Sequence, residues 1–307
     1  MSRATEEQSA KLTAVIPWWQ DSHNESLDRL ELLKACIEAL HRQDVVTPEI
    51  ILVLNASTTE PPPLPGVQIV RIKKRVTVGE ARNLGLQQVR TPFVIFCDAD
   101  DLTADNSIPW LLAKLEEHPE LIGVAGGNAS IVEPRGIVTR YRHPQDWVYR
   151  ISGSRWLLAA ANAARCCVPI ANTTVFRTDA FRLSGGFGAS NRGEDWEAGV
   201  ALLMLGHVLM VKDPITHIYR LWGETRLSRA PLPLSESLAM AARVRSRIRH
   251  DSNSLWWLRW ATILPILWSV HLFYALQLSW KRRHQAKADR VQPEANPSSL
   301  DPKPAQH

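Results

Sequence analysis

The sequence lacks the features that mark several classes of protein. It has four cysteines in 307 residues, none at a paired metal-binding spacing, and the adjacent Cys166 and Cys167 are poorly placed for disulfide geometry. We therefore expect reduced, buried thiols. Residues 1–10 are polar and contain no apolar signal region, so nothing there directs secretion, and we expect cytosolic chemistry.

A glycine-rich phosphate loop is also missing near the N-terminus. The apolar run Leu12–Pro17 is typical of a strand, and Trp18, Trp19 and Gln20 follow it. A nucleotidyltransferase would carry glycines and a basic residue at this place, so that class is disfavoured. The composition, 45% hydrophobic and 22% charged, excludes wholesale disorder and a protein with many membrane spans.

The first 130 residues alternate between two kinds of hydrophobic pattern. Short apolar runs predict strands at 12–17, 49–54, 67–72, 93–97 and 123–132, and helical spacing predicts helices at 27–40 and 78–89. This alternation predicts a doubly wound α/β fold, in which ligands bind at the carboxyl ends of the strands. After a less regular region, we expect a strand at 172–176 and a helix at 195–205.

An acidic cluster, Asp98-Ala99-Asp100-Asp101, directly follows the predicted buried strand 93–97. Crowded carboxylates repel one another, and Mg²⁺ or Mn²⁺ is the ordinary partner of an all-oxygen group of this kind. Such an ion takes one or two protein carboxylates and fills its other positions with water and phosphate oxygens. The alternative is a solvated loop that caps the next helix.

A second acidic constellation lies almost a hundred residues later. Gly185-Gly186-Phe187 precedes Arg192-Gly193 and the acids Glu194, Asp195 and Glu197, which open a predicted helix. Acids at a helix start are favoured by the helix dipole, so capping is one interpretation. The other is a general base, because a carboxylate can remove a proton from an attacking hydroxyl.

The C-terminal part is basic and rich in tryptophan. Five of the 12 tryptophans fall between 256 and 280, and residues 261–278 contain no Asp, Glu, Lys or Arg. We expect residues 255–280 to associate with an anionic membrane surface, in the plane of the membrane, as a re-entrant segment or as a single span; a buried or dimerising helix is the alternative. Nucleic acid is disfavoured because no aromatic-studded sheet accompanies the basic charge.

Six segments, in this order, resemble glycosyltransferase family 2 with its GT-A fold. They are Ala14–Pro17, Glu49–Val53, Gly79–Leu86, Phe93–Asp101, Gly185–Phe187 and Glu194–Glu197. The resemblance implies a GT-A mixed sheet flanked by helices, a nucleotide-diphosphate sugar donor (UDP-, GDP- or dTDP-sugar), a Mg²⁺ or Mn²⁺ ion, and transfer with inversion to an acceptor hydroxyl. Membrane proximity would suit a lipid-linked or glycan acceptor.

The resemblance also implies roles for single residues. Asp98 and Asp100 match the DxD motif and would hold the metal and the donor, while Asp195 would be the base, with Glu194 beside it. The donor-binding set would be Pro17, Asn55, Arg82, Asn83, Asp98, Asp100 and Arg226, with Arg229 nearby. The family often has an acidic pair after the second strand, where this chain has Leu54-Asn55, and a His where it has Trp222.

These expectations divide the chain into four parts. Residues 1–10 and 285–307 are expected to be disordered, residues 11–230 to form the GT-A domain, and residues 231–284 to form the helical membrane-associating segment. Within the domain, 11–131 would be the nucleotide-sugar half and 132–230 the acceptor half. The competing hypothesis is a catalytically silent membrane adaptor with the same fold; a nucleotidyltransferase is a weaker one.

Overall fold

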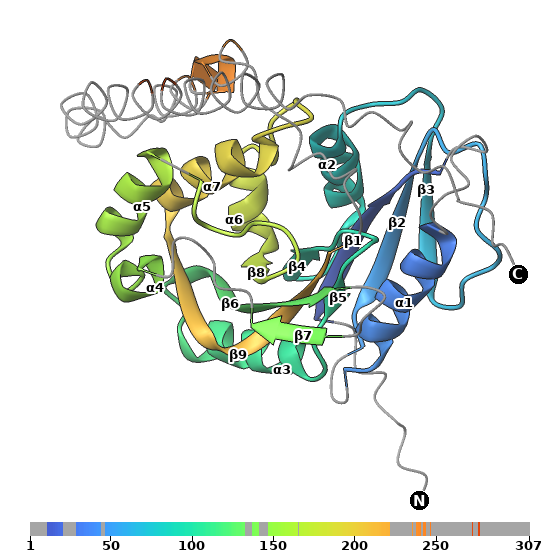
Figure 1. Cartoon of the computed structure of the whole chain (residues 1–307), viewed down its shortest axis with the longest axis horizontal. Coiled ribbons are helices and arrows are strands. Elements are labelled where there is room, and N and C mark those ends of the chain that lie inside the picture. The colour runs from blue at the N-terminus through green and yellow to red at the C-terminus, as the bar shows by residue number, and fades with distance from the viewer. Residues whose placement is uncertain are drawn as a thin grey trace, which may run out of the picture.

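A computed structural model describes residues 11–20, 29–43, 47–132, 137–140, 147–164 and 166–221, with a few further positions between 235 and 276. The strands are β1 (Leu12–Trp18), β2 (Glu49–Asn55), β3 (Val67–Ile72), β4 (Phe93–Phe96), β5 (Leu102–Thr103), β6 (Leu121–Val132), β7 (Ile137–Arg140), β8 (Thr174–Arg177) and β9 (His207–Leu221) (Figure 1). The helices are α1 (Arg29–His41), α2 (Val78–Gln88), α3 (Ser107–Glu117), α4 (Val148–Ile151), α5 (Arg155–Ala164), α6 (Thr178–Leu183) and α7 (Glu194–Leu205).

One mixed sheet runs through the described part of the molecule. Its strand order is β3-β2-β1-β4-β8-β6-β9-β5, with β7 added beside β6. β1, β2, β3 and β4 are parallel, whereas β8 runs antiparallel to β4. The chain leaves β1 toward β2 and β3, then returns to the other side of β1 for β4. In open α/β sheets the ligand-binding crevice lies at such a reversal, outside the carboxyl ends of the strands, which here are β1 and β4.

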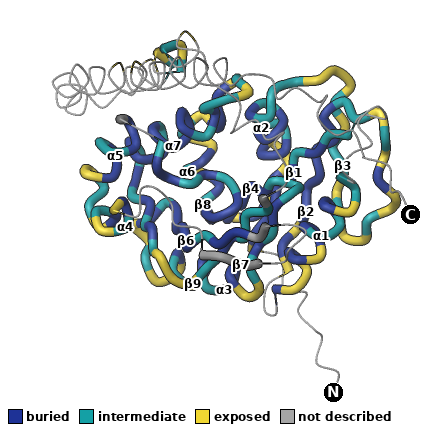
Figure 2. Tube along the Cα trace, viewed as in Figure 1, coloured by how far each residue is buried: buried dark blue, intermediate teal, exposed yellow. Residues whose placement is uncertain are grey.

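Helices cover both faces of the sheet. Side chains alternate along a strand, so Val15 of β1 joins the apolar cluster beneath α2, α6 and α7, while Ile16 joins the cluster beneath α1 and α3. The central strands are buried along their length in Figure 2. α2 approaches the sheet closely at Gly85, where an added Cβ would lie 2.4 Å from Val15 Cγ1.

α2 shows how local sequence sets the ends of an element. Thr77 and Glu80 form a capping box, in which the Thr77 hydroxyl accepts from the Glu80 N–H and the Glu80 carboxylate accepts from the Thr77 N–H. The helix ends at Gln88, shortly before Thr91-Pro92. These contacts fix the helix that carries Arg82 over the crevice.

The predicted α/β fold is confirmed, with differences at the edges. The predicted strands and helices through residue 132 are present, and α7 begins at Glu194, one residue before the predicted start. β5, β7 and the long β9 were not predicted, because their pairing is long-range and leaves little local pattern. No helix within the described residues is long and apolar enough to cross a membrane. Most of 255–280, and both predicted disordered ends, lie outside those residues.

Candidate active site

The acidic cluster forms a tight turn at the end of β4, where the Asp101 N–H donates to the Asp98 carbonyl oxygen at 3.1 Å. Its acids point in different directions. Asp101 is only 2% exposed, accepts a hydrogen bond from the Arg220 N–H at 3.0 Å, and contacts His217 Nε2 at 3.2 Å. Asp101 therefore fastens the turn to β9, which leaves Asp98 and Asp100 as the partly exposed carboxylates.

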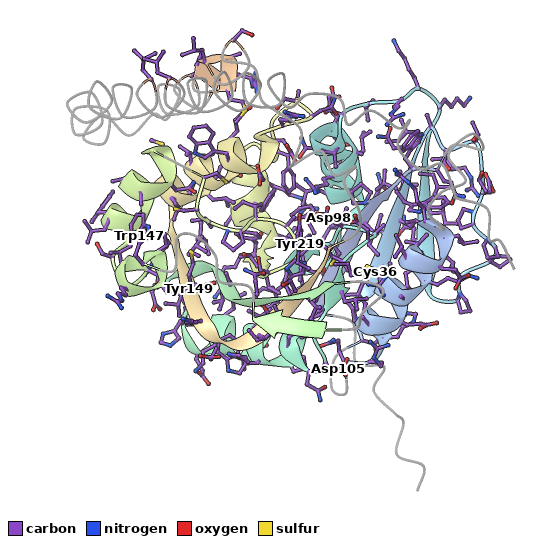
Figure 3. The ribbon with its side chains drawn as sticks, in the orientation of Figure 1. Cys36, Asp98, Asp105, Trp147, Tyr149 and Tyr219 are labelled. Carbon is purple, nitrogen blue, oxygen red and sulfur yellow. The ribbon has the colours of Figure 1, made fainter. Side chains whose placement is uncertain are left out.

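This turn does not cap the next helix. β5 follows the acids, and α3 starts only after Asn106, whose side chain makes no capping hydrogen bond. Figure 3 shows Asp98 in the middle of the molecule, at the end of β4, while Asp105 lies at its lower surface. The capping interpretation of the cluster is thus wrong for Asp98, Asp100 and Asp101.

Asn172 holds the turn from the opposite side, a role that the sequence did not reveal. Its side-chain oxygen accepts from the Asp98 N–H at 2.5 Å, and its amide donates to Asp98 Oδ2 at 3.0 Å and Asp101 Oδ2 at 3.3 Å. The residue adopts a left-handed backbone with φ 68°. Asparagine is one of the few non-glycine residues that tolerate this region, which is the one signal the sequence offered.

Arg82 joins the two acidic constellations. Its guanidinium, 5% exposed, donates to Asp98 Oδ1 at 2.5 Å and to Glu194 Oε1 at 3.0 Å. Burial alone lowers the pKa of Arg82, but the Asp98 and Glu194 carboxylates raise it above its usual range. Burial raises the pKa of Asp98, but the charge and hydrogen bond of Arg82, together with the hydrogen bond from Asn172, hold it below its ordinary value. Asp98 therefore stays ionised.

The glycine loop before α7 is fixed by Asn83. Its amide nitrogen donates to the Phe187 carbonyl oxygen at 3.0 Å, and its oxygen accepts from the Phe187 N–H at 2.9 Å. Gly186 has φ 70°, and an added Cβ would lie 2.4 Å from Asn83 Oδ1. The loop also passes close to α2, because a Cβ on Gly79 would meet the Gly188 carbonyl oxygen at 2.1 Å. Asn83 thus shapes the loop that leads to the acids.

The acids at the start of α7 have separate environments. Glu194 is turned inward to Arg82, while Asp195 is partly exposed and its Oδ1 accepts from the Trp196 N–H at 2.7 Å. Burial, followed by the Asp195 charge, raises the pKa of Glu194 to about 7. Burial likewise raises the pKa of Asp195. Of the pair, Asp195 is therefore the more exposed carboxylate.

Cys166 approaches this carboxylate. Its thiol lies 4.0 Å from Asp195 Oδ2 and is partly exposed, whereas Cys36, Cys97 and Cys167 are buried. All four are free. The expectation of buried thiols is therefore wrong for Cys166. Cys166 follows α5, which packs on α7.

Two of the predicted donor-binding residues, Pro17 and Asn55, lie at the ends of β1 and β2. Asn55 donates to the Val76 carbonyl oxygen at 2.9 Å and accepts from the Val76 N–H at 3.0 Å, so its amide supports the loop before α2. Leu54 is buried in the core at 4% exposure. Pro17 is partly buried in β1.

A stacked aromatic and cationic group follows Pro17 in the chain. The Trp19 ring has the Arg75 guanidinium 3.7 Å from its centroid and that of Arg29 at 4.9 Å. Arg29 also donates to the Trp19 carbonyl oxygen at 3.2 Å. This stacked, cationic group lies at the end of β1 that faces the crevice. Arg226, Arg229 and Trp222, by contrast, lie outside the described residues.

The described residues of the site include more carboxylates than basic side chains. Asp98, Asp195 and Glu194 all act on Arg82, and Asp100 and Asp101 lie in the adjoining turn. Hard carboxylate oxygens in excess suit Mg²⁺ or Mn²⁺. No group of three or more His, Cys, Asp or Glu side chains within the described residues could hold a metal alone. A Mg²⁺ ion needs only one or two, because substrate phosphates supply other ligands.

Comparison with known proteins identifies a matching family. Residues 21–171 match the model described as glycosyl transferase family 2. The amylovoran biosynthesis glycosyltransferase AmsE of Erwinia amylovora is 30% identical over 103 residues, which cover 31% of this chain and 39% of that protein. The match thus spans well under half of that relative, and it leaves most of this chain uncovered.

Solved structures share the fold over a longer stretch. The S. aureus TarS 1–349 complex with UDP-GlcNAc has a TM-score of 0.63 at 15% identity, covering 86% of this chain and 73% of that one. The complex of the same protein with UDP has a TM-score of 0.60 at 14% identity, covering 85% and 71%. Residues 21–171 thus match glycosyl transferase family 2, and the solved structures show that the GT-A fold is shared over most of the chain.

Proposed function

We propose that the protein transfers a sugar, with inversion, from a nucleotide-diphosphate sugar to an acceptor hydroxyl. One observation carries this proposal: Arg82 bonds both Asp98, in the turn after β4, and Glu194, at the start of α7. The acids proposed for donor binding and for proton removal, far apart in sequence, are therefore held around one buried cation. A silent adaptor would have no use for this arrangement.

Asp195 is the general base in this proposal. An acceptor hydroxyl must lose its proton as it attacks the anomeric carbon, and a partly exposed carboxylate with a raised pKa is suited to take it. The Trp196 N–H holds Oδ1, so the second oxygen is directed toward the rim at Cys166. Glu194 acts through Arg82 and keeps the guanidinium between the acids.

Asp98 and Asp100 would hold a Mg²⁺ or Mn²⁺ ion. Asp98 is kept ionised by Arg82, and Asp100 is partly exposed beside it. Asp98 already accepts bonds from Arg82 and Asn172, but a carboxylate has about four acceptor positions and retains room for a metal. The ion would neutralise charge on the departing diphosphate.

We propose a UDP-sugar as the first donor to examine. The family match and the fold shared with a protein solved with UDP-GlcNAc and UDP support it. Trp19 and Arg75 offer an aromatic face and positive charge at the expected nucleotide end of the crevice. The acceptor would be a glycan or a lipid-linked sugar, reached at the cytoplasmic membrane surface through residues 255–280.

A donor screen tests this function. The melting temperature of the purified full chain is measured with UDP-, GDP- and dTDP-sugars, each with and without Mn²⁺. One donor should raise it in a metal-dependent way, since a ligand that binds only the folded state stabilises it. Asp98→Ala should abolish the shift, and Asp105→Ala should preserve it, because Asp105 is an exposed acid paired with Arg42. Stabilisation by none of the sugars would favour the adaptor.

A further inference from the structure

Two side chains from the C-terminal part of the chain contact the start of α7. Met240 and Arg243 are three residues apart, the spacing that places helical side chains on one face. They lie beyond the 21–171 family match and beyond the predicted domain boundary at 230. The residues that they contact are Gly193, Arg192 and Glu197, which flank Glu194 and Asp195 on both sides.

Arg243 compensates a buried charge. Glu197, 4% exposed, accepts a hydrogen bond from Arg243 Nε at 2.7 Å. Its carboxylate lies against the loop, where an added Cβ on Gly188 would be 2.6 Å from the Glu197 Cδ. A carboxylate this deeply buried needs a partner, and in the described part of the chain that hydrogen bond comes from Arg243.

The same two residues hold the junction of loop and helix. Arg243 Nη2 also donates to the Arg192 carbonyl oxygen at 3.4 Å, so one guanidinium spans the last loop residues and the first helical turn. Gly193 has φ 75°, and its missing Cβ would lie 2.7 Å from Met240 Cε. Met240 therefore fits against the one position of the junction that has no side chain.

The junction lacks an ordinary local cap. Gly193 is the N-cap of α7 and offers no side-chain hydrogen bond, and Glu194 and Glu197 point away to Arg82 and Arg243. Two long-range arginine contacts, one from α2 and one from the C-terminal part, therefore hold the side chains of the first turn, and the Gly188 N–H donates to the Glu194 carbonyl oxygen at 3.2 Å. In the sequence, Asp195 lies between Glu194 and Glu197, the two residues that these arginines contact.

We infer that Met240 and Arg243 are positioning residues that hold Asp195 in its productive place, so that the active site is complete only with this C-terminal contact. The inference rests on the proposed role of Asp195 as base. Neither residue touches the reacting atoms. Their loss displaces the base while the donor site at Asp98 and Asp100 remains, so turnover falls and donor binding does not.

The test measures kcat and donor KM for full-length variants at a temperature well below each melting point. Arg243→Ala should lower kcat about 10- to 100-fold, the effect of a misplacement of roughly 1 Å, and change donor KM less than about threefold. Arg243→Lys should recover part of the loss, because it restores a cation near Glu197. Arg42→Ala, which removes an exposed arginine paired with Asp105, is the matched control and should retain wild-type kcat.

Two further variants separate positioning from folding. Glu197→Gln combined with Arg243→Ala removes the unpaired carboxylate and should have a higher kcat than Arg243→Ala alone. Met240→Ala should lower kcat without leaving a buried charge unpaired. It provides the test of positioning if Arg243→Ala does not fold. Wild-type kcat in both Arg243→Ala and Met240→Ala, or equal losses in kcat and donor affinity, would overturn the inference. Full turnover by Asp195→Asn would instead overturn the proposed base.

Discussion

The inward-facing Glu194 makes a quantitative prediction about stability and pH. Burial raises its pKa from the ordinary value of 4.5 to about 7, so the folded state holds this proton more tightly than the unfolded state does. The contribution to stability is full below pH 4.5 and is lost as the pH rises through about 7. At about 1.4 kcal/mol per pKa unit, the loss between pH 5 and pH 8 is roughly 2–3 kcal/mol.

Glu194→Gln removes this titration and keeps an oxygen that can accept from Arg82. The free energy of unfolding is measured by urea denaturation, followed by tryptophan fluorescence, at pH 5, 6, 7 and 8 in the presence of EDTA. Relative to wild type, the variant should become more stable by roughly 2–3 kcal/mol as the pH rises over this range. Glu31→Gln, at an exposed position, is the control. A difference between Glu194→Gln and wild type that stays constant with pH would refute the burial argument.

Three further predictions concern the rest of the site. Asn172→Ala should lose about 1–3 kcal/mol of stability and most activity, because the amide bonds both Asp98 and Asp101. Asn172→Gly accepts the left-handed backbone, so it should recover only the part of the lost stability that is due to backbone strain. N-ethylmaleimide should inactivate the native enzyme by alkylating Cys166, which is partly exposed while the other three thiols are buried, and Cys166→Ser should resist it. EDTA should abolish turnover, and Mg²⁺ or Mn²⁺ should restore it. Undiminished turnover in EDTA would contradict the proposed metal dependence.

The sequence predicted the parts of the fold whose signals are local. The buried run at β4, the helical spacing of α1 and the proline after α2 each act within a few residues, and these elements are present. β9 could not be predicted in this way, since its pairing with β6 joins residues about ninety positions apart. A strand of that kind is stabilised by its partner more than by its own pattern.

The candidate site likewise has parts that the sequence made visible and parts that depend on the fold. The two acidic constellations were visible in the sequence as clusters. Their shared contact with Arg82 was not, because it depends on the fold, which brings α2 between β4 and α7. The inward turn of Asp101 toward His217 and the amide of Asn172 depend on contacts across the sheet. The assignments of Asp195 as base and of Asp98 and Asp100 as metal ligands remain predictions.

We propose that Asp195 removes the acceptor proton in a sugar transfer, and one substitution tests this role most directly. With a donor identified by the thermal screen, Asp195→Asn is compared with wild type for donor affinity and for turnover. Donor and metal binding should be unchanged in Asp195→Asn, and turnover should fall at least about 100-fold, the lower end of what a positioned general base contributes. Turnover by Asp195→Asn at the wild-type rate would contradict this role.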